Sequence, residues 1–297
     1  MKKLLGIALA SAAAGLCLSA LKKASDEQTV ELSPVKRSSP NKKAILVVSF
    51  GTSYAQTREK TIGAIEEDFR SAFPEYTIRR AFTSKMIIKK LRERDGIEVD
   101  TVAQALEKLE AEGYSTVICQ PTHVMGGFEF DDVKREVENW KGRFDHIACG
   151  WPLLTSSEDY EQVTEALVQE FSDIPSDAAL VLMGHGTEHP ANATYPALDY
   201  RLKARGCKNF FVGTVEGYPD LQTVMQEVAA IHASKVFLAP LMVVAGDHAI
   251  NDLCGEEEDS WKSCFEQAGY QTEPILKGLG EYPAFRRIYL EHCVQCI

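Results

Sequence analysis

The feature that most constrains the fold of this sequence is an internal repeat. The stretch AILVVSFGTS at 44–53 is matched by ALVLMGHGTE at 179–188, and the helix-then-strand stretch at 100–121 is matched by 220–240. A repeat with so long a period indicates a duplicated domain and not a solenoid. The competing interpretation is chance similarity, because any two strand–helix–strand units share part of this pattern.

Short apolar runs that predict buried strands alternate with amphipathic stretches that predict helices. Strands are expected at 43–50, 76–82 and 115–121, and helices at 57–73 and 101–113. Such alternation favours parallel sheets covered by helices. The prediction is therefore an α/β fold of two similar domains, residues 43–174 and 175–297, each a parallel β-sheet flanked by helices.

The N-terminal residues have the composition of a targeting segment. A short basic head precedes the uncharged Ala- and Leu-rich run 4–21, which is typical of a secretory signal peptide. We assign 1–28 to this peptide and the polar, proline-containing stretch 29–42 to a linker. Export to the periplasm follows, and an uncleaved membrane anchor is the alternative because the run nearly reaches spanning length.

Charge and motifs exclude several classes of function. The formal net charge of −11 argues against nucleic acid or an anionic membrane as partner. The sequence has no Gly-rich phosphate loop ending in Gly-Lys-Ser/Thr, no GxGxxG after a strand and no GxSxG, so neither a nucleotide nor serine hydrolysis is expected. Eight cysteines include a lone CxxC at 293–296, which indicates a local disulfide or two free thiols and gives only weak support to a redox protein.

Three residues of metal-binding type follow predicted strands at corresponding positions of the repeat. His185 stands between two glycines, His248 follows Gly246 and Asp247, and Glu129 aligns with His248. Ligands of open α/β sheets bind outside the carboxyl ends of the strands, so a site between the halves would gather all three. Two imidazoles and one carboxylate suit Co, Fe, Ni or Zn.

Neighbouring polar residues have less specific interpretations. Asp247 and Asp252 are candidates to orient His248 or to cap a helix, and for Asp252 we favour the cap. His189 lies four residues after His185, but Pro190 follows it directly, so we interpret it as a loop residue. His123 lies in the loop that carries Glu129, where packing and ligand contact are equally plausible.

Four separated blocks resemble the anaerobic-type sirohydrochlorin cobalt chelatases: VVSFGTSYAQTREKTIGAIEEDF, QPTHVMGGFEFDDV, VLMGHGTEHPANATYPALD and PLMVVAGDHAINDLCGEEEDSWK. The resemblance runs from about residue 43 to the C-terminus. It implies two similar α/β domains with a tetrapyrrole cleft between them, and a metal site formed by His185, His248 and Glu129. It also implies insertion of Co²⁺ or Fe²⁺ into sirohydrochlorin without ATP, for cobalamin or sirohaem synthesis, by a chain that assembles as a homo-oligomer.

The implied chemistry assigns further roles. Metal insertion releases two N–H protons, and we expect His185 to act as both ligand and base. The carboxylates of the tetrapyrrole require donors, and the candidates are Thr52 and Ser53, which are equally suited to cap a helix, together with basic residues of the first half (Arg58, Arg79, Arg80, Lys85, Lys89). His123 and Asp247 are further candidates to contact the substrate.

The predicted export departs from the usual cytoplasmic location of the pathway. It motivates an alternative of another class, a periplasmic metal- or haem-binding carrier that reuses the chelatase fold. In that case His123 is the candidate axial haem ligand. The two functions differ in turnover, because a carrier binds the macrocycle and converts nothing.

Overall fold

The computed structural model describes residues 42–297. The predicted signal peptide (1–28) and the linker (29–42), except for its last residue, lie outside the described residues. Within 42–297, no helix has both the length and the apolar character that crossing a membrane requires.

The first half of the described chain is a four-stranded parallel sheet with the strand order β2-β1-β3-β4. Its strands are β1 (Lys43–Ser49), β2 (Thr77–Phe82), β3 (Thr116–Pro121) and β4 (His146–Cys149). Its helices are α2 (Ala55–Arg58), η1 (Glu59–Gly63), α3 (Ala64–Ala72), α4 (Lys85–Asp95), α5 (Val102–Ala111), α6 (Phe128–Asn139) and α7 (Ser157–Glu170).

The second half repeats this plan with the strand order β6-β5-β7-β8. Its strands are β5 (Ala179–Gly184), β6 (Phe210–Thr214), β7 (Lys235–Pro240) and β8 (Gln271–Pro274). Its helical segments are η2 (Pro190–Ala193), α8 (Thr194–Ala204), α9 (Leu221–Ala230), η3 (Ala249–Leu253), α10 (Trp261–Gln267), η4 (Leu279–Glu281) and α11 (Pro283–Val294). The predicted α/β class with two similar parallel sheets is confirmed.

The central strands form because their sequences are apolar on both faces. Every residue of β5 is buried, and in β1 only Lys43 is not fully buried. Side chains of one strand alternate between two faces, so β1 contributes Ile45 to one apolar cluster and Leu46 to another. Parallel sheets with helices on both faces require such continuous apolar strands.

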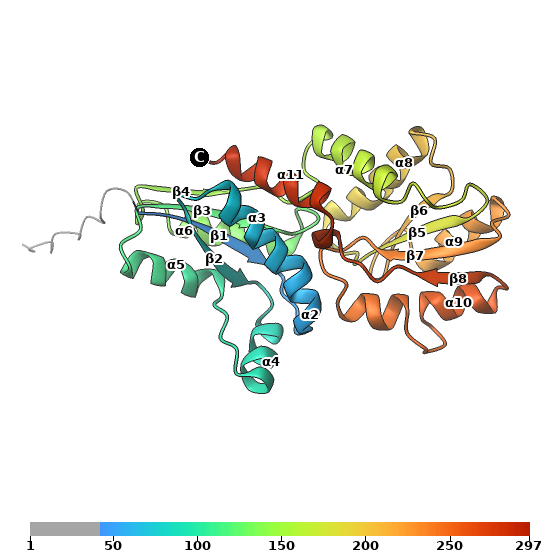
Figure 1. Ribbon diagram of the computed structural model, residues 1–297, viewed down its shortest axis with the longest axis horizontal. Coiled ribbons are helices and arrows are strands. Elements are labelled where there is room, and N and C mark those ends of the chain that lie inside the picture. The colour runs from blue at the N-terminus through green and yellow to red at the C-terminus, as the bar shows by residue number, and fades with distance from the viewer. Residues whose placement is uncertain (1–41) are drawn as a thin grey trace, which may run out of the picture. The chain divides into compact units, whose positions relative to one another are not determined.

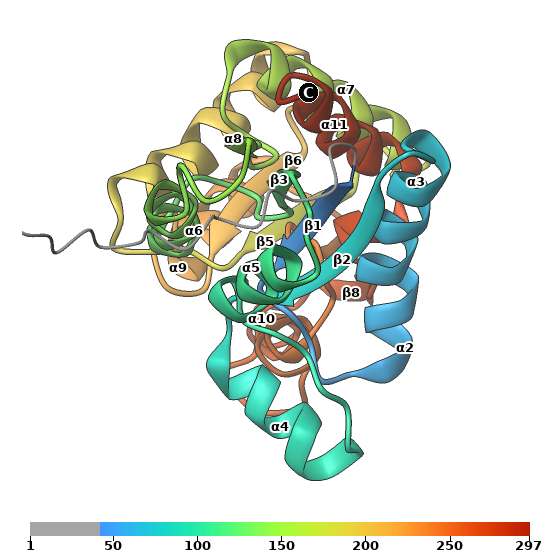
Figure 2. The same cartoon turned by 90° about the vertical axis from the view of Figure 1, so that its left-hand side faces the viewer.

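The two halves differ in one inserted helix. In the second half, α9 alone connects β6 to β7, whereas in the first half α4 and α5 connect β2 to β3. Ser84 caps the N-terminus of helix α4, and its hydroxyl accepts the N–H of Ile87. Gly96, in the left-handed conformation, caps the C-terminus. It projects from the body of the first half beside α2 (Figure 1, Figure 2).

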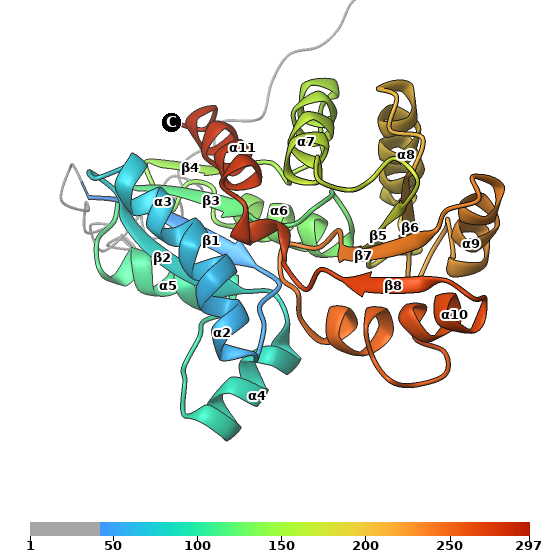
Figure 3. The ribbon, with the colours of Figure 1, turned by 45° about the vertical axis from the view of Figure 1, so that its right-hand side comes forward.

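The C-terminal helix crosses back to the first half. Helix α11 packs on α3, α7 and β3 (Figure 3). The hydroxyl of Tyr289 donates to the Thr122 carbonyl at 3.0 Å, and buried His292 lies 2.8 Å from the Asp159 carboxylate. The two sheets separate between β4 and β5, where the sequence places the boundary of the domains 43–174 and 175–297, but α11 belongs in space to the first half.

The cysteines of the described chain are all free thiols, including Cys293 and Cys296. Cys293 is fully buried in the apolar cluster that also contains Ile288 and Tyr289. Burial raises the pKa of the Cys293 thiol to about 12, with a smaller contribution from Cys296. The C-terminal CxxC is therefore part of the core packing of α11, which gives no support to the redox interpretation.

Candidate metal centre and cleft

His185 follows β5 and stands between two glycines because the chain is crowded at this point. A β-carbon on Gly184 would lie 2.1 Å from the Tyr195 ring, and one on Gly186 would lie 2.7 Å from the backbone of Glu216. Gly186 also has a φ of +85°, which glycine adopts without steric cost. The two glycines let helix α8 and the loop after β6 pack closely around the histidine.

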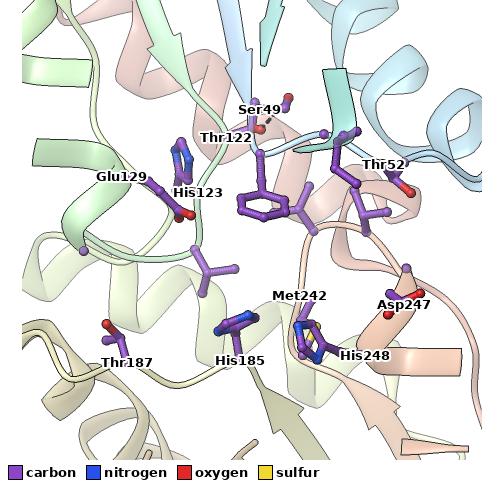
Figure 4. Close-up of a pocket in the computed structure, with 18 of the residues that line it drawn as sticks. Ser49, Thr52, Thr122, His123, Glu129, His185, Thr187, Met242, Asp247 and His248 are labelled. Atoms are coloured by element: carbon purple, nitrogen blue, oxygen red, sulfur yellow. Dashed lines mark hydrogen bonds between the residues drawn. The ribbon is translucent and has the colours of Figure 1, made fainter. Parts of the chain in front are cut away.

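His185, Glu216 and His248 form the one group of potential metal ligands within residues 42–297. Their ligand atoms all lie within 4.8 Å of one another. The two imidazole rings meet edge to face with their centroids 4.5 Å apart. Figure 4 shows the two side chains beside each other at one side of the cleft. Two imidazoles with one carboxylate form a donor set for borderline divalent metals such as cobalt and iron.

The hydrogen bonds of the two histidines indicate which ring nitrogen binds the metal. Nδ1 of His185 lies 3.0 Å from the carbonyl of Gly186, and Nδ1 of His248 lies 2.6 Å from a carboxylate oxygen of Asp252. Carbonyl and carboxylate oxygens only accept, so each Nδ1 carries the proton and each Nε2 keeps its lone pair. This arrangement leaves the Nε2 lone pair of each imidazole available to a metal.

Asp252 has a different role from the one favoured by the sequence. The helical segment η3 begins after His248 and contains Asp252, four residues further on. This spacing turns the carboxylate back to His248, so Asp252 orients the His248 imidazole and is not a helix cap. Asp247, the other candidate, instead accepts the hydroxyl of Tyr54 at 3.0 Å.

Glu216 was missed by the sequence analysis. It follows β6 by two residues, and β6 pairs with β5, so its backbone N–H donates to the carbonyl of His185 at 2.8 Å. The signal was present, because FFVGT at 210–214 is an apolar run with an acidic residue just beyond its carboxyl end. Glu216 occupies the place in the metal group that the sequence assigned to Glu129.

Glu129 lies in the cleft but in the other half of the molecule. It belongs to the first turn of α6, on the same side as His123 in Figure 4. Burial in the cleft raises the pKa of Glu129, because it destabilises the charged carboxylate. The electrostatic interaction with His185 has a smaller effect and lowers this pKa. The structure therefore places Glu129 within electrostatic reach of His185 but outside the metal group.

A cavity of about 920 Å³ lies between the halves and contains the metal group at one wall. This volume falls within the range of small-molecule sites. Of the residues predicted to bind substrate, Thr52, Ser53, His123 and Asp247 line this cleft. Lys85 does not, because it lies on the exposed outer side of α4. The lysine that lines the cleft is Lys90, one and a half turns further along the helix.

His123 lines the cleft without a hydrogen bond to either ring nitrogen. Both nitrogens are buried and have no partner among the described residues. Burial lowers the pKa of His123 to about 4, so the ring is neutral at physiological pH. Its backbone carbonyl, in contrast, accepts the N–H of Leu153 at 2.9 Å and the hydroxyl of Tyr289 at 3.3 Å. The loop is thus fixed while the imidazole remains uncharged.

Two contacts join the halves on either side of the cleft. On one side the Tyr54 hydroxyl donates to Asp247. On the other, Nε2 of His189 lies 3.3 Å from Asp131, and its ring packs edge to face on Phe128 with centroids 4.8 Å apart. Nδ1 of His189 accepts the N–H of Ala191, which confirms its interpretation as a loop residue and leaves no metal-binding role with His185.

The fold and this site define a class of protein in which two similar α/β halves enclose a cleft of about 920 Å³ with a group of potential metal ligands at its wall. Residues 43–297 match the family described as cobalt chelatase (CbiK), and the chain belongs to this family. It is 45% identical over 256 residues to the sirohydrochlorin cobaltochelatase of Salmonella typhimurium, covering 86% of this chain and 97% of that protein.

A second relative supports this assignment, and two solved structures share the fold. The sirohydrochlorin cobaltochelatase CbiKC of Nitratidesulfovibrio vulgaris is 34% identical over 90% of this chain and 94% of its own length. SirB from Bacillus subtilis with Fe³⁺ has a TM-score of 0.59 at 14% identity, covering 86% of this chain and 95% of that one. CbiX has a TM-score of 0.50 at 14% identity, with 86% and 100% covered. These two structures show the shared fold.

Proposed function

We propose that this protein inserts Co²⁺ into sirohydrochlorin and is a sirohydrochlorin cobaltochelatase. The observation that carries the proposal is the group of His185, Glu216 and His248, with two free Nε2 lone pairs, at the wall of a cleft of about 920 Å³. The names of both curated relatives support the substrate and the metal.

The reaction exchanges one divalent cation for two protons. His185, Glu216 and His248 hold the Co²⁺ substrate and leave positions open for pyrrole nitrogens. The macrocycle lies in the cleft between the halves and loses two N–H protons as four nitrogens bind the metal. His185 is suited to accept one proton, because its Nε2 lone pair is free once the metal has left, and the second proton is released to water.

The test follows metal insertion directly. The full chain is mixed anaerobically with sirohydrochlorin and Co²⁺, and the absorbance change of the macrocycle is recorded. A rate far above the uncatalysed background is expected, together with its loss in the His185→Ala and His248→Ala variants. A rate equal to the background, with the macrocycle still bound, would refute the chelatase activity.

Cobalt is the proposed metal, and iron is the alternative. The same nitrogen and oxygen donors accept both cations, and cellular selection often follows supply. Competition between Co²⁺ and Fe²⁺ for insertion by one protein sample measures the preference. The alternative of a periplasmic metal- or haem-binding carrier, with His123 as axial ligand, has no support from the relatives, which are both named as chelatases.

We further propose that the protein is exported to the periplasm and forms a homo-oligomer. The export proposal rests on the basic head and apolar run of residues 1–28. Cell fractionation with mass spectrometry of the mature N-terminus tests it, since recovery of intact Met1 in the cytoplasm contradicts cleavage. The homo-oligomer rests on the family resemblance alone, and light scattering of the purified chain measures its mass.

A further inference from the structure

The two walls of the cleft differ in charge, because the first half contributes one lysine and one carboxylate, Glu129, and the second half contributes only carboxylates. The wall from the second half contributes Glu188, Glu216 and Asp247, next to the two histidine ligands. Among the described residues that line the cleft, the single Lys or Arg is Lys90 of α4, in the first half. A metal cation and an anionic ligand would therefore be attracted to different walls.

Helix α4 concentrates positive charge beside the cleft. This is the helix that the second half lacks, and its charged residues are Lys85, Lys89, Lys90, Arg92 and Arg94 against Glu93 and Asp95. Lys89 lies 4.0 Å from Glu93, whereas Lys90 has no carboxylate within that distance in residues 42–297. Met86 lines the same cleft and is 70% exposed, so an apolar surface lies next to the free ammonium group.

The loop after β1 presents unpaired donors next to this helix. The carbonyl of Thr52 accepts Nη1 of Arg58 at 3.1 Å, and the carbonyl of Ser53 accepts Nη2 of Arg94 at 2.5 Å. The backbone N–H groups of Thr52 and Ser53 donate to no acceptor of the described residues, although the two residues are only 4% and 2% exposed. Buried backbone donors almost always have a partner, so these two N–H groups call for one.

The corresponding loop of the second half pairs the donor that matches Thr52. Thr187, which the repeat aligns with Thr52, donates its backbone N–H to Oδ1 of Asn192 at 3.1 Å. Gly186, one residue earlier, donates to the Tyr195 hydroxyl at 3.4 Å. The unpaired N–H of Thr52 is therefore not a consequence of the shared fold. Glu188, which aligns with Ser53, is exposed to solvent, whereas Ser53 is buried.

We propose that the Thr52–Ser53 backbone and the ammonium group of Lys90 form a carboxylate-binding subsite for the tetrapyrrole. Backbone N–H groups and a nearby lysine are a common combination for binding an anionic oxygen. The subsite orients the macrocycle, with one carboxylate edge toward α4 and the central nitrogens over His185 and His248. This inference rests on the proposed function and adds the residues that recognise the substrate.

The test compares two adjacent lysines of α4. Lys90→Glu reverses the charge at the cleft, and Lys89→Glu makes the same change on an exposed side chain that does not line it. For Lys90→Glu, the KM for sirohydrochlorin is expected to rise about tenfold, or about 1.4 kcal/mol. Its kcat and its KM for Co²⁺ should stay within about twofold, and Lys89→Glu should match wild type. Equal KM values for the two variants would overturn the proposal.

A binding measurement separates this inference from the chelatase assignment. Quenching of sirohydrochlorin fluorescence gives its Kd without metal, and the Lys90→Glu variant should bind about tenfold more weakly than Lys89→Glu at low salt, with the difference shrinking as salt rises. The methyl ester of sirohydrochlorin should bind both variants equally, and a tenfold difference that persists with the ester would refute carboxylate recognition. If wild type binds sirohydrochlorin but inserts no metal, the chelatase assignment fails while the subsite is still measured.

Discussion

The two halves of this molecule share one sheet order but hold different chemistry at their strand ends. The second half carries His185, Glu216 and His248, and its loop after β5 is closed by hydrogen bonds to its own side chains. The first half has an open loop after β1, the additional helix α4 and the neutral His123. The two halves thus provide similar frames, and in our proposal the cleft between them separates cation binding from recognition of the macrocycle.

Because the cation and the macrocycle are bound by different halves, substitutions in the two halves are predicted to affect different kinetic constants. Changes at the second half's strand ends should weaken the metal step, and changes at the first half's loop and α4 should weaken macrocycle binding. Each experiment below compares positions in this way, beginning with the largest expected effect.

The largest effect is expected from loss of a metal-binding imidazole. His185→Ala or His248→Ala should lower the rate of Co²⁺ insertion by about 1000-fold, since each removes a ligand and His185 also removes the proposed base. Stopped-flow absorbance at saturating sirohydrochlorin measures this rate. The Kd for sirohydrochlorin, measured without metal, should change less than about threefold, because these variants remove groups that bind the metal and not the macrocycle.

His232 offers a matched control for these variants. It is exposed and lies outside the cleft, and its φ of +53° is a conformation that asparagine tolerates. His232→Asn should therefore retain the wild-type rate. If His185→Ala retains it too, the second half does not hold the reacting metal.

The second prediction concerns α11, the element that belongs to the second half in sequence and to the first half in space. Nδ1 of His292 faces the carbonyl of Trp151 at 3.0 Å, and Nε2 faces Asp159 at 2.8 Å. His292 and Asp159 are both at least 95% buried, so His292→Ala leaves a buried carboxylate without its partner. The free energy of unfolding should fall by about 3 kcal/mol, as measured by urea denaturation.

The same pair predicts a dependence on pH. Burial by itself raises the pKa of Asp159, but hydrogen bonds from His292 and from the backbone of Ser156 and Thr155 outweigh it and leave the pKa lowered. A lowered folded-state pKa stabilises the protein above the unfolded pKa of about 3.9, and the contribution is lost as the pH falls through the folded value. Asp159→Asn should remove this part of the acid sensitivity. An unchanged stability profile between pH 5 and pH 2 would contradict the assignment.

The third prediction compares the carboxylates that the two halves contribute to the cleft. Glu216→Gln removes a negative ligand from the metal group, so the KM for Co²⁺ should rise about tenfold, or about 1.4 kcal/mol. Glu129→Gln is the matched change across the cleft and should raise this KM by less than about threefold, because Glu129 lies outside the group. A larger effect of Glu129→Gln would show that the sequence-based choice of carboxylate was right.

Much of this arrangement follows from the sequence. The apolar runs of β1, β3 and β5 predict parallel strands, and the glycines around His185 predict an exposed imidazole at a strand end. The repeat aligns the two halves and predicts that their strand ends face one cleft. These predictions succeed because they depend on local periodicity and on a rule of α/β sheets that holds for every copy of the unit.

The parts that sequence reasoning missed depend on which elements are neighbours. Glu216 joins the group of potential metal ligands because β6 pairs with β5, a choice that no local pattern expresses. Lys90, and not Lys85, lines the cleft because burial of Leu91 against Phe82 and Val99 sets the rotation of α4. Helix α11 returns to the first half because Tyr289 and His292 find partners there, 130 to 170 residues away along the chain. Tertiary contacts decide each of these points.

The smallest effect is expected where the halves touch directly. Tyr54→Phe removes the hydroxyl that donates to Asp247, while burial, followed by the interaction with Asp247, raises the pKa of Tyr54 and keeps it a donor at neutral pH. The loss should be about 1 kcal/mol or less, seen as a small drop in Tm and a rise of up to about fivefold in the KM for sirohydrochlorin. Tyr218→Phe is the matched control, because this side chain is 61% exposed and its hydroxyl has no partner in the described residues. A larger effect than that of Glu216→Gln would mean that closure of the two halves, and not the metal group, limits the reaction.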